Sequence, residues 1–455
     1  MQPTINAIVE AQRRFFETGA TREVSARRAA LERLGKCVRG REEQILAAVR
    51  ADLGKPRLEA YLSEVHFVLQ EIGYAVKHLT SWARPRRVST NLFNVPARCE
   101  IRAEPYGVVL ILGPWNYPFQ LVMGPVVSAI AAGNCVTVKP SEHAAATAAV
   151  VKAILAECFD TSHVAVFDGG PEVAQELLAQ AFDYVFYTGN AQVGRLVMEA
   201  CVKNLTPLTL ELGGKCPCIV DHRIDLRKAV QRIARGKFFN AGQTCVAPDY
   251  VCVHESIYEP FLAQMSQTVE EFYGKEPRNS PDYGRIINQR HFDRLTGLLP
   301  DADRAAARND RESRFFGPIV LRDAGWQDRA MEEEIFGPIL PCLVYSDVGS
   351  VLAEVRRRPK PLALYIFSND TLFQERCLEA VGSGGACIND TLMHITPLTL
   401  PFGGVGQSGM GQYHGKFGFD TFTHARSVMR KGFRFDLFGV CPPYGAILDR
   451  IKRFL

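Results

Sequence analysis

Residues 238–250 read FFNAGQTCVAPDY and carry one cysteine, Cys245, at the end of a predicted loop. Gly242 lies in turn-favouring sequence, whereas Val251 and Val253 alternate as in a following strand. A thiol at such a junction can be presented to a cleft. Because a free cysteine is more often a small buried hydrophobic side chain than a nucleophile, Cys245 needs partners elsewhere in the sequence to carry a reaction.

Three other stretches supply such partners: Glu211 in LTLELGG, Asn116 in GPWNYP and Glu334 in EEEIFGPIL. A thiol, two carboxylates and an amide donor are the groups that covalent attack on a carbonyl requires. A free thiol with a pKa of about 8.5 is only slightly ionised near neutrality, so a nearby base increases its reactivity. Taken singly, the same residues also fit ordinary roles, with Asn116 as a helix cap and each glutamate as an ion-pair partner or helix end.

The composition is that of a soluble globular protein of two or three domains. The chain has 455 residues, of which 47% are hydrophobic and 22% are charged. A net charge of +4 gives no reason to expect a nucleic-acid partner. The 13 cysteines lack paired spacing, the histidines lack metal-binding spacing, and we find neither a secretory signal nor a membrane-spanning apolar run. We therefore expect a cytoplasmic protein with reduced thiols and no metal.

The apolar pattern changes along the chain from helices to alternating strands and helices. Residues 1–83 have apolar side chains at helical spacing. Strands are then predicted at Val108–Leu112, Cys135–Val138, Val164–Phe167 and Tyr184–Tyr187, and helices at Phe119–Ala132, Ala144–Cys158, Pro171–Ala181 and Gln192–Cys201. This alternation requires crossover connections, which predicts an α/β fold with a parallel sheet covered on both faces. A second alternating region is predicted from Leu212 to Asp390.

Several candidate ligand contacts directly follow predicted strands, at the edge where α/β sheets bind their ligands. Gly189 and Gly194 flank a strand-to-helix turn, GNAQVG, whose amides suit a phosphate. Lys139 and Glu142, three residues apart at another turn, suit the hydroxyls of a ribose. An ordinary turn also uses two glycines, and a Lys–Glu pair is commonly a solvated cap. The residues alone leave both interpretations open at each place.

Two extended segments and a short tail complete the chain. Residues 85–105 predict an extended arm, and Phe419–Lys431 predicts a strand that pairs with it near Cys99. The tail from Pro443 to Leu455 predicts a short basic amphipathic helix. Such a helix either contacts a membrane surface or packs on its own protein, and packing is the more common outcome.

Seven motifs occur in order along the chain: GPWNYPF, VKPSE, YTGNAQVG, LELGGK, FFNAGQTCVAPDY, EEIFGPIL and LPFGGVGQSGMG. Together they resemble the signature sequences of the NAD(P)-dependent aldehyde dehydrogenase superfamily. The later stretches NDTLMHITPLTLPFGG and YHGKFGFDTFTH are most similar to its class 3 branch, which acts on fatty and aromatic aldehydes. The resemblance runs from about Ala11 to Lys431, nearly the whole chain.

This resemblance implies an aldehyde dehydrogenase-like fold with two open parallel α/β sheets and a small bridging arm. One sheet belongs to a Rossmann-like cofactor domain and the other to a catalytic domain. The expected divisions are 1–83 and 107–210 for the NAD(P)-binding domain, 211–395 for the catalytic domain, 84–106 and 418–437 for the bridging or oligomerisation arm, and 438–455 for the tail. It also implies a homodimer.

The resemblance further implies a role for each motif residue. Cys245 is the expected nucleophile, Glu211 the base that activates water, and Asn116 the amide that holds the carbonyl oxygen. The expected NAD(P) contacts are Trp115, Lys139, Glu142, Thr188, Gly189, Gly194, Leu212, Glu334 and Phe336. A carboxylate at Glu142 disfavours a 2′-phosphate, so NAD is the expected cofactor, with NADP possible. Expected pocket walls are Tyr117, Leu121, the neighbourhood of Phe238 and residues 394–396.

The expected activity is oxidation of small-molecule medium- or long-chain aliphatic or aromatic aldehydes to carboxylic acids through a thioester on Cys245. A relative that transfers the acyl group to coenzyme A does not require a water-activating base, so Glu211 argues against it. A thioester hydrolase and a catalytically silent binding protein with the same fold remain the alternatives. The intact set of Cys245, Glu211 and Asn116 argues against a silent protein.

Replacing the nucleophile gives the first test. Cys245→Ala is expected to abolish aldehyde oxidation while cofactor binding is retained, because only the attacking atom is lost. NADH absorbance with a panel of aldehydes measures the first effect, and cofactor titration measures the second. Substantial NADH formation by the variant contradicts the assignment of Cys245.

Overall fold

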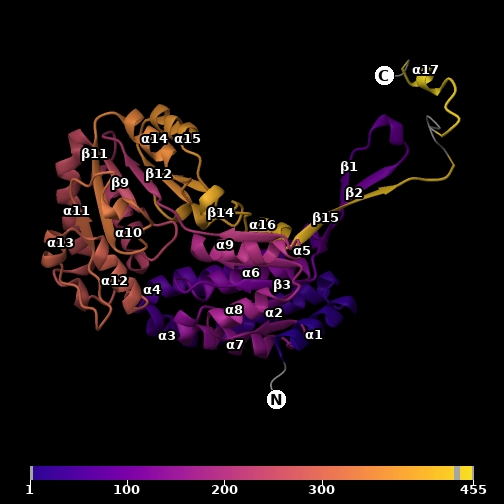
Figure 1. The fold of residues 1–455 in the computed structure, drawn as a ribbon, viewed down its shortest axis with the longest axis horizontal. Coiled ribbons are helices and arrows are strands. Elements are labelled where there is room, and N and C mark those ends of the chain that lie inside the picture. Colours follow the sequence, from indigo (N-terminus) through magenta and orange to yellow (C-terminus); the bar gives the residue numbers. More distant parts are fainter. Residues whose placement is uncertain (1–3, 435–440, 453–455) are drawn as a thin grey trace.

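The structure, a computed structural model, describes residues 4–434 and 441–452. Two large sheets, each covered by helices on both faces, lie side by side, and a narrow third sheet projects from one end (Figure 1). The two large sheets have the α/β arrangement that the alternating sequence pattern predicts. The predicted fold class is therefore confirmed.

The first large sheet has the strand order β14-β7-β6-β3-β4-β5. Its strands are β3 (Val108–Leu112), β4 (Cys135–Lys139), β5 (Val164–Val166), β6 (Tyr184–Thr188), β7 (Leu208–Glu211) and β14 (Gly409–Met410). All neighbours are parallel except β14, which pairs antiparallel with β7. The strands β3, β4 and β6 are buried throughout, as their near-continuous apolar sequences require when both faces of a sheet are covered.

Alternate residues of β3 point into two different cores of the first sheet. Val109 and Ile111 pack with the helices of one face, whereas Val108 and Leu110 pack with those of the other. The first face is covered by α2 (Val24–Gly40), α3 (Glu42–Leu53), α5 (Phe67–Trp82), α6 (Gln120–Ala132) and α7 (Ala145–Cys158), and the second by α1 (Ile5–Glu17), α8 (Pro171–Leu178) and α9 (Ala191–Val202). The N-terminal helices thus complete the first sheet's layers.

The second large sheet has the order β10-β11-β9-β8-β12-β13 and is parallel throughout. Its strands are β8 (Pro217–Val220), β9 (Tyr250–His254), β10 (Ile319–Leu321), β11 (Ile339–Tyr345), β12 (Ala363–Phe367) and β13 (Gly385–Ile388). Its helices are α10 (Leu226–Phe238), α11 (Tyr258–Tyr273), α12 (Gln289–Leu298), α13 (Asp301–Ala306), α14 (Val348–Arg357) and α15 (Thr371–Ala380). Cys245 lies in the loop that enters β9, a central strand of this sheet.

Short helical turns connect these elements. They are α4 (Arg57–Ala60), the π-helical η1 (Tyr61–His66), and the 3-10 turns η2 (Leu92–Asn94), η3 (Glu142–Ala144), η4 (Phe239–Gly242), η5 (Glu255–Ile257), η6 (Pro277–Asn279), η7 (Arg329–Met331), η8 (Met393–Ile395) and η9 (Gly406–Ser408). The predicted helix 171–181 is shorter than expected, since α8 ends at Leu178. Phe182 then turns into the core, which ends the helix.

The third sheet is the predicted arm, with the order β1-β2-β15. Its strands are β1 (Arg86–Val88), β2 (Arg98–Pro105) and β15 (Thr423–Arg430), and Met429 pairs with Cys99 as expected. The prediction that the last strand begins at Phe419 is wrong, because Gly415–Thr421 form helix α16. Phe419 and Phe422, three residues apart, are both buried in the core of the first sheet, and the strand starts only after them.

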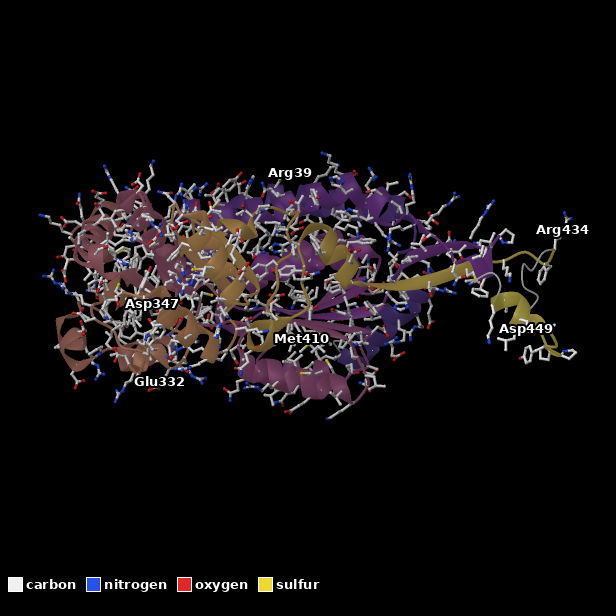
Figure 2. All side chains as sticks on the ribbon, turned by 90° about the horizontal axis from the view of Figure 1, so that it is seen from above. Arg39, Glu332, Asp347, Met410, Arg434 and Asp449 are labelled. Carbon is white, nitrogen blue, oxygen red and sulfur yellow. The ribbon has the colours of Figure 1, made fainter. Side chains whose placement is uncertain are left out.

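The tail does not follow the favoured expectation of packing on its own protein. Helix α17 (Ile447–Lys452) lies beyond the third sheet and away from both large sheets (Figure 1), and Leu448 on it is 60% exposed. Figure 2 places Arg434 and Asp449 at this far end of the molecule. Parts of the predicted tail and arm boundary, residues 435–440 and 453–455, fall outside the described residues. Among the described helices, none is long and apolar enough to cross a bilayer.

Candidate active site

The loop that carries Cys245 begins with three consecutive residues in the left-handed region. Their φ values are 54° at Asn240, 51° at Ala241 and 74° at Gly242. A side chain at Gly242 is excluded, because its Cβ would lie 2.3 Å from the carbonyl oxygen of Gly337. Three left-handed residues are costly, so this turn has to be held by its surroundings.

Side-chain hydrogen bonds hold the turn. The Asn240 Nδ2 donates to the carbonyl oxygens of Gln243 and Asn116, at 3.1 and 2.9 Å. The Gln243 Nε2 donates to the carbonyl oxygens of Asn240 and Arg285, at 3.0 and 2.9 Å, while its Oε1 accepts from the Ile287 amide at 3.0 Å. The Nδ2 of Asn240 and both polar atoms of the Gln243 side chain thereby fix the main chain just before Cys245.

A fully buried ion pair joins this turn to the first sheet. Lys55 Nζ lies 2.5 Å from Glu64 Oε1, with both side chains completely buried. The same Nζ donates to the Asn116 carbonyl oxygen at 3.2 Å. Glu64 Oε2 accepts from the amides of Phe119 and Gln120 at 3.1 and 2.9 Å, at the start of α6. The pair therefore locks Asn116 between α6 and the Cys245 turn.

Asn116 is placed to bind an oxygen next to Cys245. Its side chain is 4% exposed, and its Nδ2 donates to the Gln243 carbonyl oxygen at 3.1 Å. An amide nitrogen carries two hydrogens, so Asn116 can hold Gln243 with one and a ligand oxygen with the other. The adjacent Tyr117 hydroxyl bonds to Thr244 Oγ1 at 2.5 Å, which places this predicted pocket wall beside Cys245 as well.

The Cys245 thiol is half-buried between two carboxylates. Its pKa is raised far above the ordinary range, first by burial and then by the negative charges of Glu334 and Glu211. The thiol is therefore protonated in this arrangement, and attack requires a base to take its proton. The Cys245 carbonyl oxygen in turn accepts from the Cys216 thiol at 3.4 Å.

Glu211 is the last residue of β7 and is only 3% exposed. Within the described residues neither of its carboxylate oxygens has a hydrogen-bond partner, and burial raises its pKa well above the ordinary value. Thr188, its neighbour in register on β6, also has a buried hydroxyl that no described residue bonds. Unsatisfied buried polar groups are rare, so their presence together indicates a place for water or a ligand.

Glu334 lies in a loop that is fastened to the second sheet. The Ile335 amide donates to Asp249 Oδ1 at 3.0 Å, and Asp249 is paired with Lys215 at 2.5 Å. The Glu334 carboxylate lies against Gly213, where a Cβ would approach its Oε2 to 1.9 Å. Burial raises the pKa of Glu334 to about 8. The structure thus brings Glu211, Glu334, Asn116 and Cys245 together from four separate segments.

The residues present fit a bound dinucleotide. A Cβ at Gly189 would lie 2.2 Å from the Tyr187 hydroxyl, and one at Gly194 would lie 2.9 Å from Leu212. Both glycines are therefore required by close packing against these side chains at the N-terminus of α9, which Asn190 caps, and a helix N-terminus suits a phosphate. The unbonded hydroxyl of Thr188 lies next to this turn.

Other predicted cofactor contacts form two side-chain pairs. Lys139 and Glu142 form an ion pair of 2.8 Å. Burial raises the pKa of Glu142, but the Lys139 ammonium outweighs it and holds that pKa below the ordinary value. In the second pair, Phe336 lies edge-on to Trp115 with ring centroids 5.3 Å apart. Its φ of 49° is a strained conformation of the kind found at binding sites.

Several residues that build the site carry no recognisable motif. Lys55 and Glu64 lie in an N-terminal region that showed only helical spacing. His291, on α12, has its ring 4.9 Å from that of Trp115 and a buried Nδ1 that lacks a partner within the described residues. Burial lowers its pKa to about 4, so it is neutral at physiological pH. Only spatial proximity reveals these residues, since none lies in a strand-end motif.

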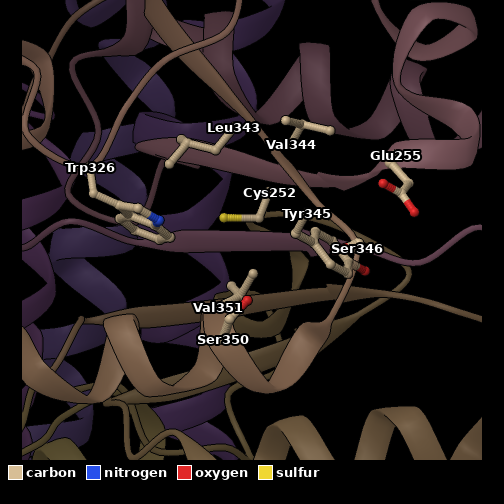
Figure 3. Close-up of a pocket in the computed structure, with 9 residues that line it drawn as sticks. All are labelled: Cys252, Glu255, Trp326, Leu343, Val344, Tyr345, Ser346, Ser350 and Val351. Carbon is tan, nitrogen blue, oxygen red and sulfur yellow. The ribbon is translucent and has the colours of Figure 1, made fainter.

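Of the other predicted pocket walls, His394 packs on a residue beside Cys245, whereas Phe238 and Leu121 are buried in other surroundings. His394 packs against Tyr365 with ring centroids 5.8 Å apart, and the Tyr365 hydroxyl donates to the Val246 carbonyl oxygen beside Cys245. Phe238 is buried in the second sheet's core, and Leu121 is buried on α6. A separate hollow of about 260 Å³ opens beside Cys252, Trp326 and residues 343–346, and Cys245 does not line it (Figure 3).

Breaking the buried ion pair tests whether it supports this site. Glu64→Gln leaves the Lys55 ammonium buried without its counter-charge, so we expect a loss of about 3–5 kcal/mol in the free energy of unfolding, measured by denaturant titration. Glu43→Gln, which removes an exposed partner of Arg57, is the matched control and is expected to change stability little. Equal stability of the two variants contradicts a structural role for the buried pair.

The family model for the aldehyde dehydrogenase family matches residues 2–428. The chain is 46% identical to 4,4'-diaponeurosporen-aldehyde dehydrogenase of Staphylococcus aureus, over 97% of this chain and 96% of that protein. It is also 46% identical to aldehyde dehydrogenase family 3 member A2 of Mus musculus, over 93% of this chain and 87% of that protein. The solved substrate-bound state of Staphylococcus aureus AldH superposes with a TM-score of 0.96 at 44% identity and covers all of both chains.

These matches confirm the resemblance that the seven motifs indicate, and the identities near 45% to family 3 members agree with the class 3 variants of those motifs. They also support an active enzyme over the catalytically silent alternative, since the matched family oxidises aldehydes to carboxylic acids with NAD(P). The chain therefore belongs to the aldehyde dehydrogenase family, as an NAD(P)-dependent, class 3-like enzyme that oxidises aldehydes to acids.

Proposed function

We propose that Cys245 is the nucleophile of this reaction and that Asn116 and the Cys245 main-chain amide hold the oxyanion. The observation that carries the proposal is the convergence of Asn116, Glu211 and Glu334 on one half-buried thiol. Attack of the thiolate on the aldehyde carbon gives a thiohemiacetal, whose negative oxygen the two N–H donors stabilise. One such donor is typically worth about a hundred- to a thousandfold in rate.

The proposed second half of the reaction belongs to Glu211. Bound NAD(P)+ would supply the hydride acceptor, and loss of hydride from the thiohemiacetal carbon would leave a thioester on Cys245. A water then loses a proton to Glu211 and forms a bond to the acyl carbon, and the carboxylic acid departs as the thiolate leaves. The two unbonded carboxylate oxygens of Glu211 support this role, because they leave that side chain able to bind a water next to Cys245.

We assign the cofactor to the cleft between the two large sheets. Gly189, Gly194 and Thr188 are proposed to bind its phosphates, and Lys139 and Glu142 its adenosine ribose. Glu334 is proposed to position the nicotinamide ribose. Trp115, Leu212 and Phe336 are proposed to line the nicotinamide end. The two glycines at the N-terminus of α9 and the contact between the Trp115 and Phe336 rings support the assignment.

The proposal also covers the domain division of the chain, its oligomeric state, its location in the cell and its substrate. The three sheets support the division into domains at 1–83 and 107–210, 211–395, and an arm at 84–106 and 418–437, although β14 from residues 409–410 completes the first sheet. The projecting arm supports a homodimer, and the free state of the cysteines supports a cytoplasmic location. The name of the Staphylococcus aureus relative supports a long, apolar aldehyde as substrate.

The two carboxylates are expected to serve different steps. Glu211→Gln should still acylate and reduce one cofactor per site, and then stall at the thioester. Stopped-flow NADH absorbance should therefore show a burst followed by a slow steady phase. Glu334→Gln should slow hydride transfer itself and show no burst, because misplacing reacting atoms by about 1 Å costs on the order of a hundredfold.

Glu211 also acts on the Cys245 thiol through its charge. If it assists thiol deprotonation, the burst of Glu211→Gln becomes slower but remains stoichiometric. A burst from Glu334→Gln together with none from Glu211→Gln reverses the two roles.

Cofactor preference is expected to depend on Glu142. Its negative charge repels a 2′-phosphate, so NAD+ should be preferred over NADP+ by a modest factor. Glu142→Gln should narrow or reverse that preference. The measurement is kcat/KM for both cofactors in both proteins. An unchanged ratio shows that Glu142 does not lie near the 2′ position.

A further inference from the structure

The segment that follows β14 passes directly beside Glu211. Gly409 on β14 pairs in register with Glu211 on β7, which fixes the start of this segment against the catalytic strand. Four residues after Gly409, Tyr413 exchanges two main-chain hydrogen bonds with Phe402, at 2.7 and 3.0 Å. The Gly415 amide donates to the Glu71 carboxylate at 3.1 Å. Tyr413 is therefore held in place on both sides.

The Tyr413 ring fills a closed aromatic space. The residue is 1% exposed, and its ring packs against those of Phe186 and Phe402 at centroid distances of 5.1 and 5.7 Å and of His414 at 4.3 Å. His414 has a φ of 81°, a conformation that persists only where its surroundings impose it. A phenylalanine fits the same apolar space, so packing does not account for the hydroxyl.

The Tyr413 hydroxyl is a buried polar group without a well-formed hydrogen bond. In the part of the chain that the structure describes, no hydrogen bond to it meets normal geometry, although an interaction with the Gln120 side chain lowers its pKa. Burial is the main cause that raises the pKa of Tyr413, so the phenol stays protonated. The Tyr413 ring packs on Phe186, two residues before the register partner of Glu211, and therefore lies on the same face of the first sheet as that carboxylate.

Two buried polar groups, the Tyr413 hydroxyl and the Glu211 carboxylate, thus lie on the same face of the first sheet without a well-formed hydrogen bond. Buried polar groups of this kind are normally satisfied by ordered water that makes two to four hydrogen bonds. A water between them has a hydrogen-bonding group on each side. A lone pair of this water is then available to attack an acyl group that is bound to the Cys245 sulfur.

We infer that Tyr413 is a positioning residue that holds, together with Glu211, the water that hydrolyses the thioester on Cys245. The inference rests on the role proposed above for Glu211. The water gives one proton to Glu211 and bonds to the acyl carbon, and the carbon–sulfur bond breaks with its electron pair on Cys245. Tyr413 keeps its own proton and accepts the second hydrogen of the water.

The test is Tyr413→Phe in the full chain, followed by stopped-flow NADH absorbance with saturating aldehyde and NAD+. We expect a burst of one NADH per site, which shows that folding, acylation and hydride transfer are intact. The steady rate should then fall by about 10- to 100-fold, as for misplacement of one reacting group. Added hydroxylamine, a nucleophile that needs no held water, should restore turnover and release a hydroxamate.

Tyr184→Phe is the matched control. Tyr184 is another buried tyrosine on which the Glu211 charge acts, but its hydroxyl is already bonded to Thr209 Oγ1 at 2.7 Å. This variant should show a steady rate close to that of the unmodified enzyme. The double variant Glu211→Gln with Tyr413→Phe should be no slower than Glu211→Gln alone, because the two groups act on one water.

Separate outcomes identify which claim fails. A normal steady rate for Tyr413→Phe, loss of its burst, or no rescue by hydroxylamine overturns the role of Tyr413, provided that Glu211→Gln stalls after a burst. If Glu211→Gln itself turns over normally, the proposed role of Glu211 fails, and the inference about Tyr413 fails with it.

Discussion

The active site depends on a buried ion pair that is not itself part of the chemistry. Lys55 and Glu64 are both fully buried, and two isolated charges in that position carry a large desolvation cost. Each charge makes further hydrogen bonds that offset this cost, Lys55 to the Asn116 carbonyl oxygen and Glu64 to the first amides of α6. The pair thereby fixes the amide donor and the turn before Cys245 relative to one another.

The rest of the site follows from that fixed frame. Three left-handed residues aim the chain so that Cys245 enters the cleft from the second sheet, while Glu211 reaches it from the first. Burial raises the pKa of the thiol and of both carboxylates together. Each of these groups therefore holds its proton more tightly than it would in water, and its surroundings have to accept that proton before the group can react.

Much of the fold was predictable because its cause is local. The strands at 108–112, 135–139 and 184–188 are near-continuous apolar runs of the kind that a parallel sheet covered on both faces accommodates. Phe419 was assigned to a strand because alternation alone does not show that it and Phe422 are drawn into the core as part of a helix.

The residues of the candidate site likewise fall into two groups, those that a sequence motif marks and those that only the folded structure reveals. Cys245, Glu211 and Asn116 lie at strand ends or turns in recognisable motifs, so their types and order identified them. Lys55, Glu64 and Tyr413 contribute through contacts with residues 50 to 200 positions away. No periodicity or turn signal marks such contacts, and only the folded chain shows them.

The central claim is that the acyl group is carried on the sulfur of Cys245. Its most direct test is mass spectrometry of Glu211→Gln quenched in acid shortly after mixing with an aldehyde and NAD+. The account predicts a mass increase equal to one acyl group, located by peptide mapping on the peptide that contains Cys245. An unmodified Cys245, or an acyl group found on Cys216 instead, contradicts it.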